Sequence, residues 1–202
     1  MKTKKALIVV DVQNDFCPNG KLAVNEGDQV VDPINKLMET GKYDLIVATL
    51  DWHPQNHKSF ASNNNANVFS MGTLGNQPQV MWPDHCVQNS YGAQVHPKLN
   101  INYIQHFVKK GTNPEIDSYS GFFDNDKKSA TGLHDLLSKN EIVEVDVVGL
   151  ALDYCVKSTA EDAKILGYKT NVLVNLTRAV NMNKGDDQKA IEDLKKVGVV
   201  VK

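Results

Sequence analysis

Short runs that are almost entirely apolar recur along the chain, and they restrict its fold more than any other feature of the sequence. Continuous apolar character, rather than strict alternation, is typical of β-strands that are buried on both faces. Gly, Pro, Asn or Asp residues bound each run, as they do at the ends of strands. We predict strands at residues 6–10, 43–50, 103–110, 142–150, 169–176 and 197–201.

Longer amphipathic segments separate these runs, and we predict helices at about 28–40, 129–139, 153–167 and 185–196. Asp153 is expected to cap the start of the third helix and Gly167 to end it, whereas Pro33 should kink the first helix or delay its start. Repeated alternation of strand and helix implies right-handed crossovers and parallel pairing. The predicted fold class is therefore α/β, a three-layer α/β/α sandwich with a mostly parallel sheet of about six strands.

The chain length and composition predict a single domain that spans residues 1–202, with an ordinary balance of 41% hydrophobic and 23% charged residues. One connection is unusually long. Residues 61–82 are polar and rich in asparagine, and loops of this length in compact domains are usually functional or disordered.

The same composition excludes several classes of partner. A formal net charge of −2 gives no basic surface for nucleic acid, and no apolar stretch approaches the length of about 18 residues that would span a membrane. The N-terminal apolar run lasts only five residues before Asp11, which is too short for a signal peptide, so we expect a cytoplasmic protein. Cys17, Cys86 and Cys155 are an odd number without CxxC spacing, which indicates neither a disulfide framework nor a zinc finger.

Chemically able side chains follow the predicted strands. In an open parallel sheet, ligands bind at the carboxyl ends of the strands, so these side chains should converge there. They are Asp11 after the first strand, Asp51 and His53 after the second, Lys110 at the end of the third and Cys155 just past the fourth.

Each of these residues also has a purely structural interpretation. An aspartate can stabilise a turn, a lysine can be solvated at a strand end, and a cysteine can pack as a small apolar side chain. The position of Cys155 favours reactivity, because it lies in the first turn of a predicted helix, where the helix dipole and free N–H groups lower the pKa of a thiol.

Histidines cluster around the second strand end. Asp51 and His53 form a D-x-H pair, His57 follows, and "WPDHC" supplies His85, a set that suits a divalent transition metal such as zinc, iron or manganese. Hydrogen bonds to the backbone could satisfy the same histidines without a metal, and the residues alone leave both interpretations open. Three further histidines have no such pattern and are interpreted as structural: His96, His106 and His134.

Five motifs, in order along residues 6–178, carry a resemblance to a known family. They are "DVQNDF", "DWHPQNHKSF", "WPDHCVQ", "KGTNPEIDSYSGFFD" and "GLALDYCVKSTAEDA". Together they resemble the nicotinamidase branch of the isochorismatase-like cysteine hydrolases. The long 61–82 segment departs from the compact members of that family.

The resemblance implies a catalytic triad of Asp11, Lys110 and Cys155. In the family's scheme the aspartate takes the thiol proton, the thiolate attacks an amide carbonyl, and water hydrolyses the resulting thioester. The family also has a cis peptide bond that matches Leu150–Ala151, and its oxyanion hole matches the backbone N–H groups of Ala151 and Cys155.

The resemblance further implies one divalent metal ion, with Zn²⁺ as the first expectation and Fe²⁺ or Mn²⁺ as alternatives. Its ligands match Asp51, His53 and His85, with His57 as a further candidate. In the family the ion binds the pyridine nitrogen of the substrate. Aromatic residues that line the ring pocket match Phe16, Trp82 and Tyr119.

Three hypotheses about function follow. The first is a metal-dependent amidase of NAD salvage that hydrolyses nicotinamide and also pyrazinamide. Its expected partner is the small-molecule substrate nicotinamide, and a homo-oligomer is a further candidate. The second is an isochorismatase-like amidohydrolase with a non-pyridine substrate. The third is a zinc-stabilised interaction module without activity, in which an aspartate and a lysine beside Cys155 would be needless.

Overall fold

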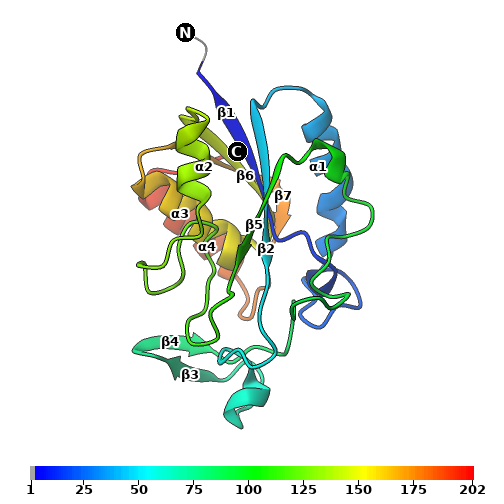
Figure 1. The fold of residues 1–202 in the computed structure, drawn as a ribbon, viewed down its shortest axis with the longest axis vertical. Helices are drawn as coiled ribbons and strands as arrows, with labels where there is room; N and C mark the ends of the chain where they lie inside the picture. The colour runs from blue at the N-terminus through cyan, green and yellow to red at the C-terminus, as the bar shows by residue number, and fades with distance from the viewer. Residues whose placement is uncertain (1–2) are drawn as a thin grey trace.

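The computed structural model describes residues 3–202, which form a six-stranded sheet between two layers of helices (Figure 1). The strand order is β5-β2-β1-β6-β7-β8, and every neighbouring pair is parallel. Each strand overlaps one of the predicted apolar runs, so the predicted fold class is confirmed. The strands are β1 (Lys5–Val10), β2 (Leu45–Asp51), β5 (His106–Lys110), β6 (Glu144–Leu150), β7 (Lys169–Arg178) and β8 (Val200–Val201).

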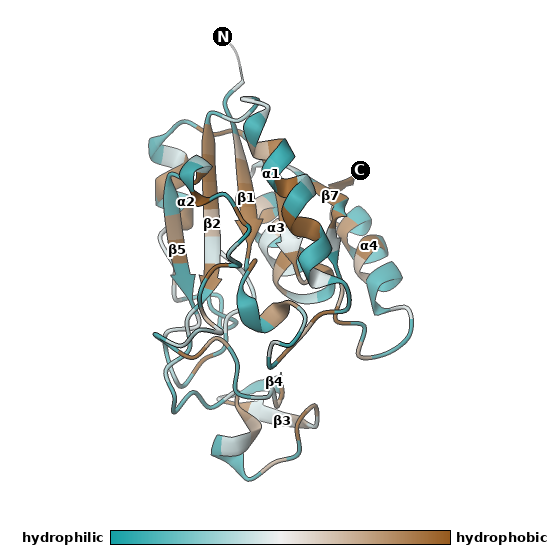
Figure 2. Cartoon of the chain, turned by 90° about the vertical axis from the view of Figure 1, so that its right-hand side faces the viewer, coloured by the Kyte–Doolittle hydropathy of each residue, from teal (hydrophilic) through white to brown (hydrophobic). Residues whose placement is uncertain are grey.

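Among residues 3–202, four α-helices cover the sheet, and each overlaps a predicted helix. They are α1 (Val31–Glu39), α2 (Leu133–Lys139), α3 (Lys157–Ile165) and α4 (Asp186–Lys196). Helix α1 packs on one face, and the other three pack on the opposite face (Figure 1). Alternate residues of β1 enter the two cores: Ile8 packs on the three-helix side and Leu7 on the α1 side. The central strands β1 and β2 are accordingly largely hydrophobic along their length (Figure 2).

Two details at helix starts differ from the predictions. The predicted third helix begins as a π-helical turn, Leu152–Val156, and becomes α-helical only in α3. Asp153 does not cap it; the carboxylate instead accepts hydrogen bonds from the N–H groups of Val180 and Asn181, each 2.9 Å away. Gly167 does follow the helix in the left-handed conformation, with φ +93°.

Pro33 lies in the first turn of α1, where its missing N–H costs no helical hydrogen bond. The helix therefore begins at Val31, three residues later than predicted, after a short 3₁₀ turn at Gly27–Val30. Other 3₁₀ turns occupy Asn14–Phe16, Ala61–Asn64 and Ile101–Tyr103.

The long 61–82 segment contains a β-hairpin that sequence patterning did not predict. Strands β3 (Met71–Leu74) and β4 (Gln77–Val80) pair antiparallel across Gly75 and Asn76. A two-residue Gly-Asn turn is a recognised hairpin signal, but the flanking residues are mostly polar and β4 contains Pro78. The hairpin lies beyond the carboxyl ends of the sheet strands (Figure 1).

Within residues 3–202, no helix is both long enough and apolar enough to cross a membrane.

Candidate active site

The carboxyl edge of the sheet brings Asp11, Lys110 and Cys155 together. Asp11 follows β1, Lys110 is the last residue of β5, and Cys155 lies in the π-helical turn after β6. All three side chains are buried. Gly149 allows the close approach of β6 to β1, because a Cβ atom there would lie 2.1 Å from the carbonyl oxygen of Val10.

Lys110 is the hub of this cluster. Its Nζ lies 3.0 Å from Asp11 Oδ2 and 3.4 Å from Cys155 Sγ, and it also forms an ion pair with Asp51 Oδ1. The Ser118 carbonyl accepts a further hydrogen bond from Nζ at 2.9 Å. A carboxylate oxygen of Asp11 lies within 4.8 Å of the Cys155 sulfur, so a thiol, a base and a cation share one buried site.

Burial controls the protonation of this cluster. It raises the pKa of the Cys155 thiol well above the ordinary value, although nearby Lys110 acts in the opposite direction. Burial also raises the pKa of Asp11, against the opposing effect of Lys110. Burial alone would lower the pKa of Lys110, but the carboxylates of Asp11 and Asp51 outweigh it and keep the ammonium charged.

The sequence-based expectation of a lowered thiol pKa is therefore wrong for the substrate-free site. The helical turn is present, but the loss of solvent around Cys155 raises the thiol pKa more than the nearby charge of Lys110 lowers it. A raised pKa favours the protonated, neutral form of the thiol. The Leu150–Ala151 peptide bond before this turn is cis, as the resemblance implied.

A candidate metal centre lies beside the cluster. Asp51 Oδ2 is 3.6 Å from Nε2 of His53 and 3.7 Å from Nε2 of His85. Each ring directs its Nδ1 at a backbone carbonyl, His53 at Gly111 (2.9 Å) and His85 at Pro83 (2.7 Å). A proton on Nδ1 leaves a lone pair on each Nε2, which is the arrangement found at metal-binding histidines. The donor set of one carboxylate and two imidazoles therefore fits a divalent transition metal.

His57 packs against this centre with its ring centroid 4.4 Å from that of His53, but its nitrogens have other partners. Its Nδ1 accepts a hydrogen bond from the Ser59 N–H (3.1 Å), which leaves Nε2 to donate to the Ile116 carbonyl (3.3 Å). Burial lowers the pKa of His57 to about 4, so the ring is neutral. Three other histidines were interpreted from the sequence as structural: His96, His106 and His134. None of them lines the pocket that contains Cys155, which is described next.

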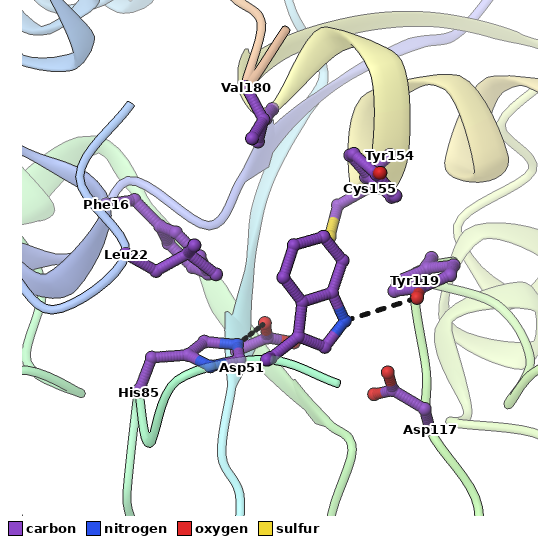
Figure 3. Close-up of a pocket in the computed structure, with 11 residues that line it drawn as sticks. Phe16, Leu22, Asp51, His85, Asp117, Tyr119, Tyr154, Cys155 and Val180 are labelled. Carbon is purple, nitrogen blue, oxygen red and sulfur yellow. Dashed lines mark hydrogen bonds and ion pairs between the residues drawn. The ribbon is translucent and has the colours of Figure 1, made fainter. Parts of the chain in front are cut away.

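The aromatic residues expected at the site line one pocket with Cys155 (Figure 3). Trp82 Nε1 donates a hydrogen bond to the Tyr119 hydroxyl (3.2 Å), and Phe16 lies on the far side near His85. The pocket has about 360 Å³ of empty space, with the open solvent at its mouth included. Asp51 and His85 also line it, so the candidate metal centre borders the same cavity.

Several pocket residues were not singled out from the sequence: Leu22, Asp117, Tyr154 and Val180. Asp117 and Tyr154 lie inside motifs that were recognised, next to residues that were named. Leu22 and Val180 are apolar loop residues, and no local pattern distinguishes them from others of their kind.

The fold and the site together define a class. A parallel α/β sheet with a buried thiol, a base and a cation at its carboxyl edge is the arrangement of a cysteine hydrolase. Comparison with known families agrees with this class, because the isochorismatase domain matches residues 5–202. The chain belongs to the isochorismatase family.

Individual relatives are similar along their whole length. The nicotinamidase of Escherichia coli (strain K12) is 47% identical over 199 residues, which is 98% of this chain and 93% of that protein. A nicotinamidase and pyrazinamidase structure from Acinetobacter baumanii is 41% identical with a TM-score of 0.94, covering 100% of this chain and 96% of that one. The pyrazinamidase of Pyrococcus horikoshii, solved in complex with zinc, is 34% identical with a TM-score of 0.80 over 98% of each chain.

Proposed function

We propose that this chain hydrolyses nicotinamide to nicotinate and ammonia through a thioester on Cys155, and so supplies nicotinate to NAD salvage. The observation that carries the proposal is the Cys155 sulfur, which lies 3.4 Å from Lys110 Nζ in a pocket lined by aromatic rings. The activity named for the Escherichia coli and Acinetobacter relatives supports it.

The triad residues take the following roles. Asp11 removes the thiol proton, a role to which its raised pKa suits it, and Lys110 stabilises the thiolate that forms. The Cys155 sulfur attacks the carboxamide carbon, and the C–N bond breaks as Asp11 returns the proton to the departing ammonia. Asp11 then takes a proton from water, and the water oxygen attacks the thioester carbon. The C–S bond breaks, nicotinate leaves, and Asp11 returns the proton to the Cys155 sulfur.

The backbone N–H groups of Ala151 and Cys155 stabilise the oxyanion of both tetrahedral intermediates. Ala151 lines the pocket beside the sulfur, and its N–H has no hydrogen-bond acceptor among residues 3–202. An N–H group without an internal partner is available to the substrate oxygen.

Asp51, His53 and His85 would hold one divalent ion, and the zinc in the Pyrococcus structure favours Zn²⁺, although Fe²⁺ and Mn²⁺ accept the same donors. The bound ion would supply a Lewis-acid site for the pyridine nitrogen and so orient the ring. His57, the further candidate ligand, packs against the His53 ring, and we expect it to orient His53 rather than to bind the ion.

Phe16, Trp82 and Tyr119 form the walls that hold the ring. Pyrazinamide has the same carboxamide and a nitrogen at the equivalent ring position, so it enters by the same contacts. The names of the Acinetobacter and Pyrococcus proteins support this second substrate.

Ammonia release from a set of amides tests the proposal. The zinc-loaded protein should hydrolyse nicotinamide and pyrazinamide and should be far slower on benzamide, which keeps the ring and the carboxamide but lacks the ring nitrogen. Chelation should abolish the activity, and zinc should restore it. Equal rates on benzamide and nicotinamide would favour the second hypothesis, an amidohydrolase with a non-pyridine substrate.

A further inference from the structure

Gln13, in the motif "DVQNDF", is fully buried at the carboxyl edge of the sheet but does not line the pocket. Its side-chain amide pairs with both peptide groups of Asp51. Oε1 accepts a hydrogen bond from the Asp51 N–H (2.9 Å), and Nε2 donates to the Asp51 carbonyl (2.8 Å). Nε2 also donates to the carbonyl of Ala93 (2.9 Å).

This pairing replaces a backbone contact that the sheet cannot make. Strand β1 pairs with β2 as far as Val10 and Thr49, and Asp11 then turns the chain away with φ +48°. The main chain of β1 is therefore not aligned with Asp51. The Gln13 amide takes the place of a neighbouring strand there, while the register with Lys110 of β5 holds Asp51 from the other side.

Asp51 needs an accurate position because its carboxylate serves two groups. Oδ1 pairs with the Lys110 ammonium, and Oδ2 faces the free nitrogens of His53 and His85. A displacement of the Asp51 backbone would therefore move the lysine partner and one candidate metal ligand together.

Gln13 also contacts a chain segment that follows His85 in the sequence. The Gln13 amide donates to the Ala93 carbonyl, and the Gln13 backbone forms a bridge with Val95, so residues 93–95 lie against Gln13. One buried amide thus contacts the backbone of both Asp51 and Ala93.

We propose that Gln13 is a positioning residue, whose amide fixes Asp51 so that one carboxylate can serve the metal centre and Lys110 at once. This inference rests on the proposed function only for its kinetic readout. A purely structural Gln13 would contribute buried hydrogen bonds to folding and nothing more, so the test must measure the metal centre itself.

Gln13→Met keeps the length and removes the amide, and Gln13→Asn keeps an amide that is one methylene too short to pair with Asp51. Gln105→Met is the matched control, because Gln105 Oε1 also bonds to the β2 backbone, at the Ile46 N–H (2.6 Å) near the opposite end of the strand. Zn²⁺ affinity would be measured by competition with a chelator, and the absorption spectrum of the Co²⁺-loaded protein would report ligand geometry.

Both Gln13 variants should bind Zn²⁺ about 10 to 100-fold more weakly and change the Co²⁺ spectrum, because residues that orient metal ligands have effects of this size. Their kcat for nicotinamide should fall more than their KM rises, and Gln105→Met should match the wild type in all these readouts. Wild-type Zn²⁺ affinity and spectrum in a folded Gln13 variant would overturn the proposal.

Failure of both Gln13 variants to fold, while Gln105→Met folds, would also overturn it in favour of a purely structural role. Absence of Zn²⁺ binding by the wild-type protein would contradict this inference. Normal Zn²⁺ binding without nicotinamide turnover would instead contradict only the proposed function.

Discussion

At the scale of single residues, the sequence was enough to identify the triad residues, but not the protonation of the thiol or the role of Gln13. Strand ends and motifs were enough to select Asp11, Lys110 and Cys155, because a parallel sheet brings its carboxyl ends together. The protonation of the thiol could not be predicted, because it depends on how completely Cys155 is buried. The role of Gln13 was equally hidden, since its partners come from Asp51 and Ala93, far along the chain.

Replacement of the base tests the first residue-scale prediction. Asp11→Asn keeps the shape but cannot take a proton, so kcat should fall by a factor of about 100 or more. Asp84→Asn, which changes a carboxylate outside the pocket, should leave kcat near the wild-type value. Steady-state rates of ammonia release check this, and a kcat within about threefold of the wild type in Asp11→Asn would remove Asp11 from the triad.

The pH dependence of the wild-type protein tests the same residue. Asp11 must be ionised to accept the proton, and burial raises its pKa above the ordinary value. The kcat/KM should therefore fall as the pH drops through this raised pKa, at a higher pH than an exposed aspartate would give. A pH–rate profile that stays flat down to the ordinary carboxyl range would contradict the assignment.

Alanine variants of two neighbouring histidines, His53 and His57, test which of them binds the metal. His53→Ala removes a free Nε2 that faces Asp51 and should abolish Zn²⁺ binding at micromolar metal, because a centre with three protein ligands cannot lose one. His57→Ala removes a ring whose nitrogens are already bonded and should retain Zn²⁺. Metal analysis after dialysis distinguishes them, and equal loss of zinc would mean that His57 is a ligand.

At the scale of elements, long buried strands were predictable and the hairpin was not. Strands β1, β2 and β6 are apolar runs, and their burial on both faces explains that composition. Strands β3 and β4 are short and mostly polar, so no apolar pattern marks them. Their position is fixed by side chains such as Gln79, which donates hydrogen bonds to Asp117 (2.7 Å) and to the Tyr119 hydroxyl (3.4 Å).

The hairpin should therefore affect substrate binding more than chemistry. Gln79→Leu removes hydrogen bonds to two pocket residues and should raise the KM for nicotinamide about three to tenfold, which corresponds to about 1 kcal/mol, while kcat changes less. Gln77→Leu makes the same change at an exposed position of β4 and should leave both constants unchanged. An unchanged KM in Gln79→Leu would mean that the hairpin does not support the pocket wall.

At the scale of the whole molecule, the two ends of the parallel strands contribute to different properties, one to the candidate active site and the other to stability. The carboxyl edge carries the candidate active site, whereas the opposite edge carries a charge network around Glu144, which bonds to Lys5, Lys169 and Asn171. The network holds β1, β6 and β7 together at their first residues. Stability and activity should therefore respond separately to mutation.

Glu144→Gln tests this separation. The hydrogen bond from Lys169, with help from Lys5, lowers the pKa of Glu144 to about 2, below its ordinary value of 4.5. Glu144 therefore stabilises the fold fully above about pH 4.5, and this contribution is lost as the pH falls towards 2. The variant should lose about 1 kcal/mol of unfolding free energy at pH 7, much less at pH 2.5, and no activity. Denaturant unfolding at both pH values checks it, and an equal loss at both would contradict the account.

The central claim is that Cys155 is the nucleophile of an amidase, and one side-by-side measurement tests it most directly. Ammonia release from nicotinamide would be followed with zinc-loaded wild type, Cys155→Ala and Cys17→Ala, the last as another buried cysteine, outside the pocket. Zinc content and thermal unfolding would be recorded for each. We predict that Cys155→Ala is folded, binds zinc and releases no ammonia above the uncatalysed rate, whereas Cys17→Ala retains activity. Substantial ammonia release by Cys155→Ala would contradict the account.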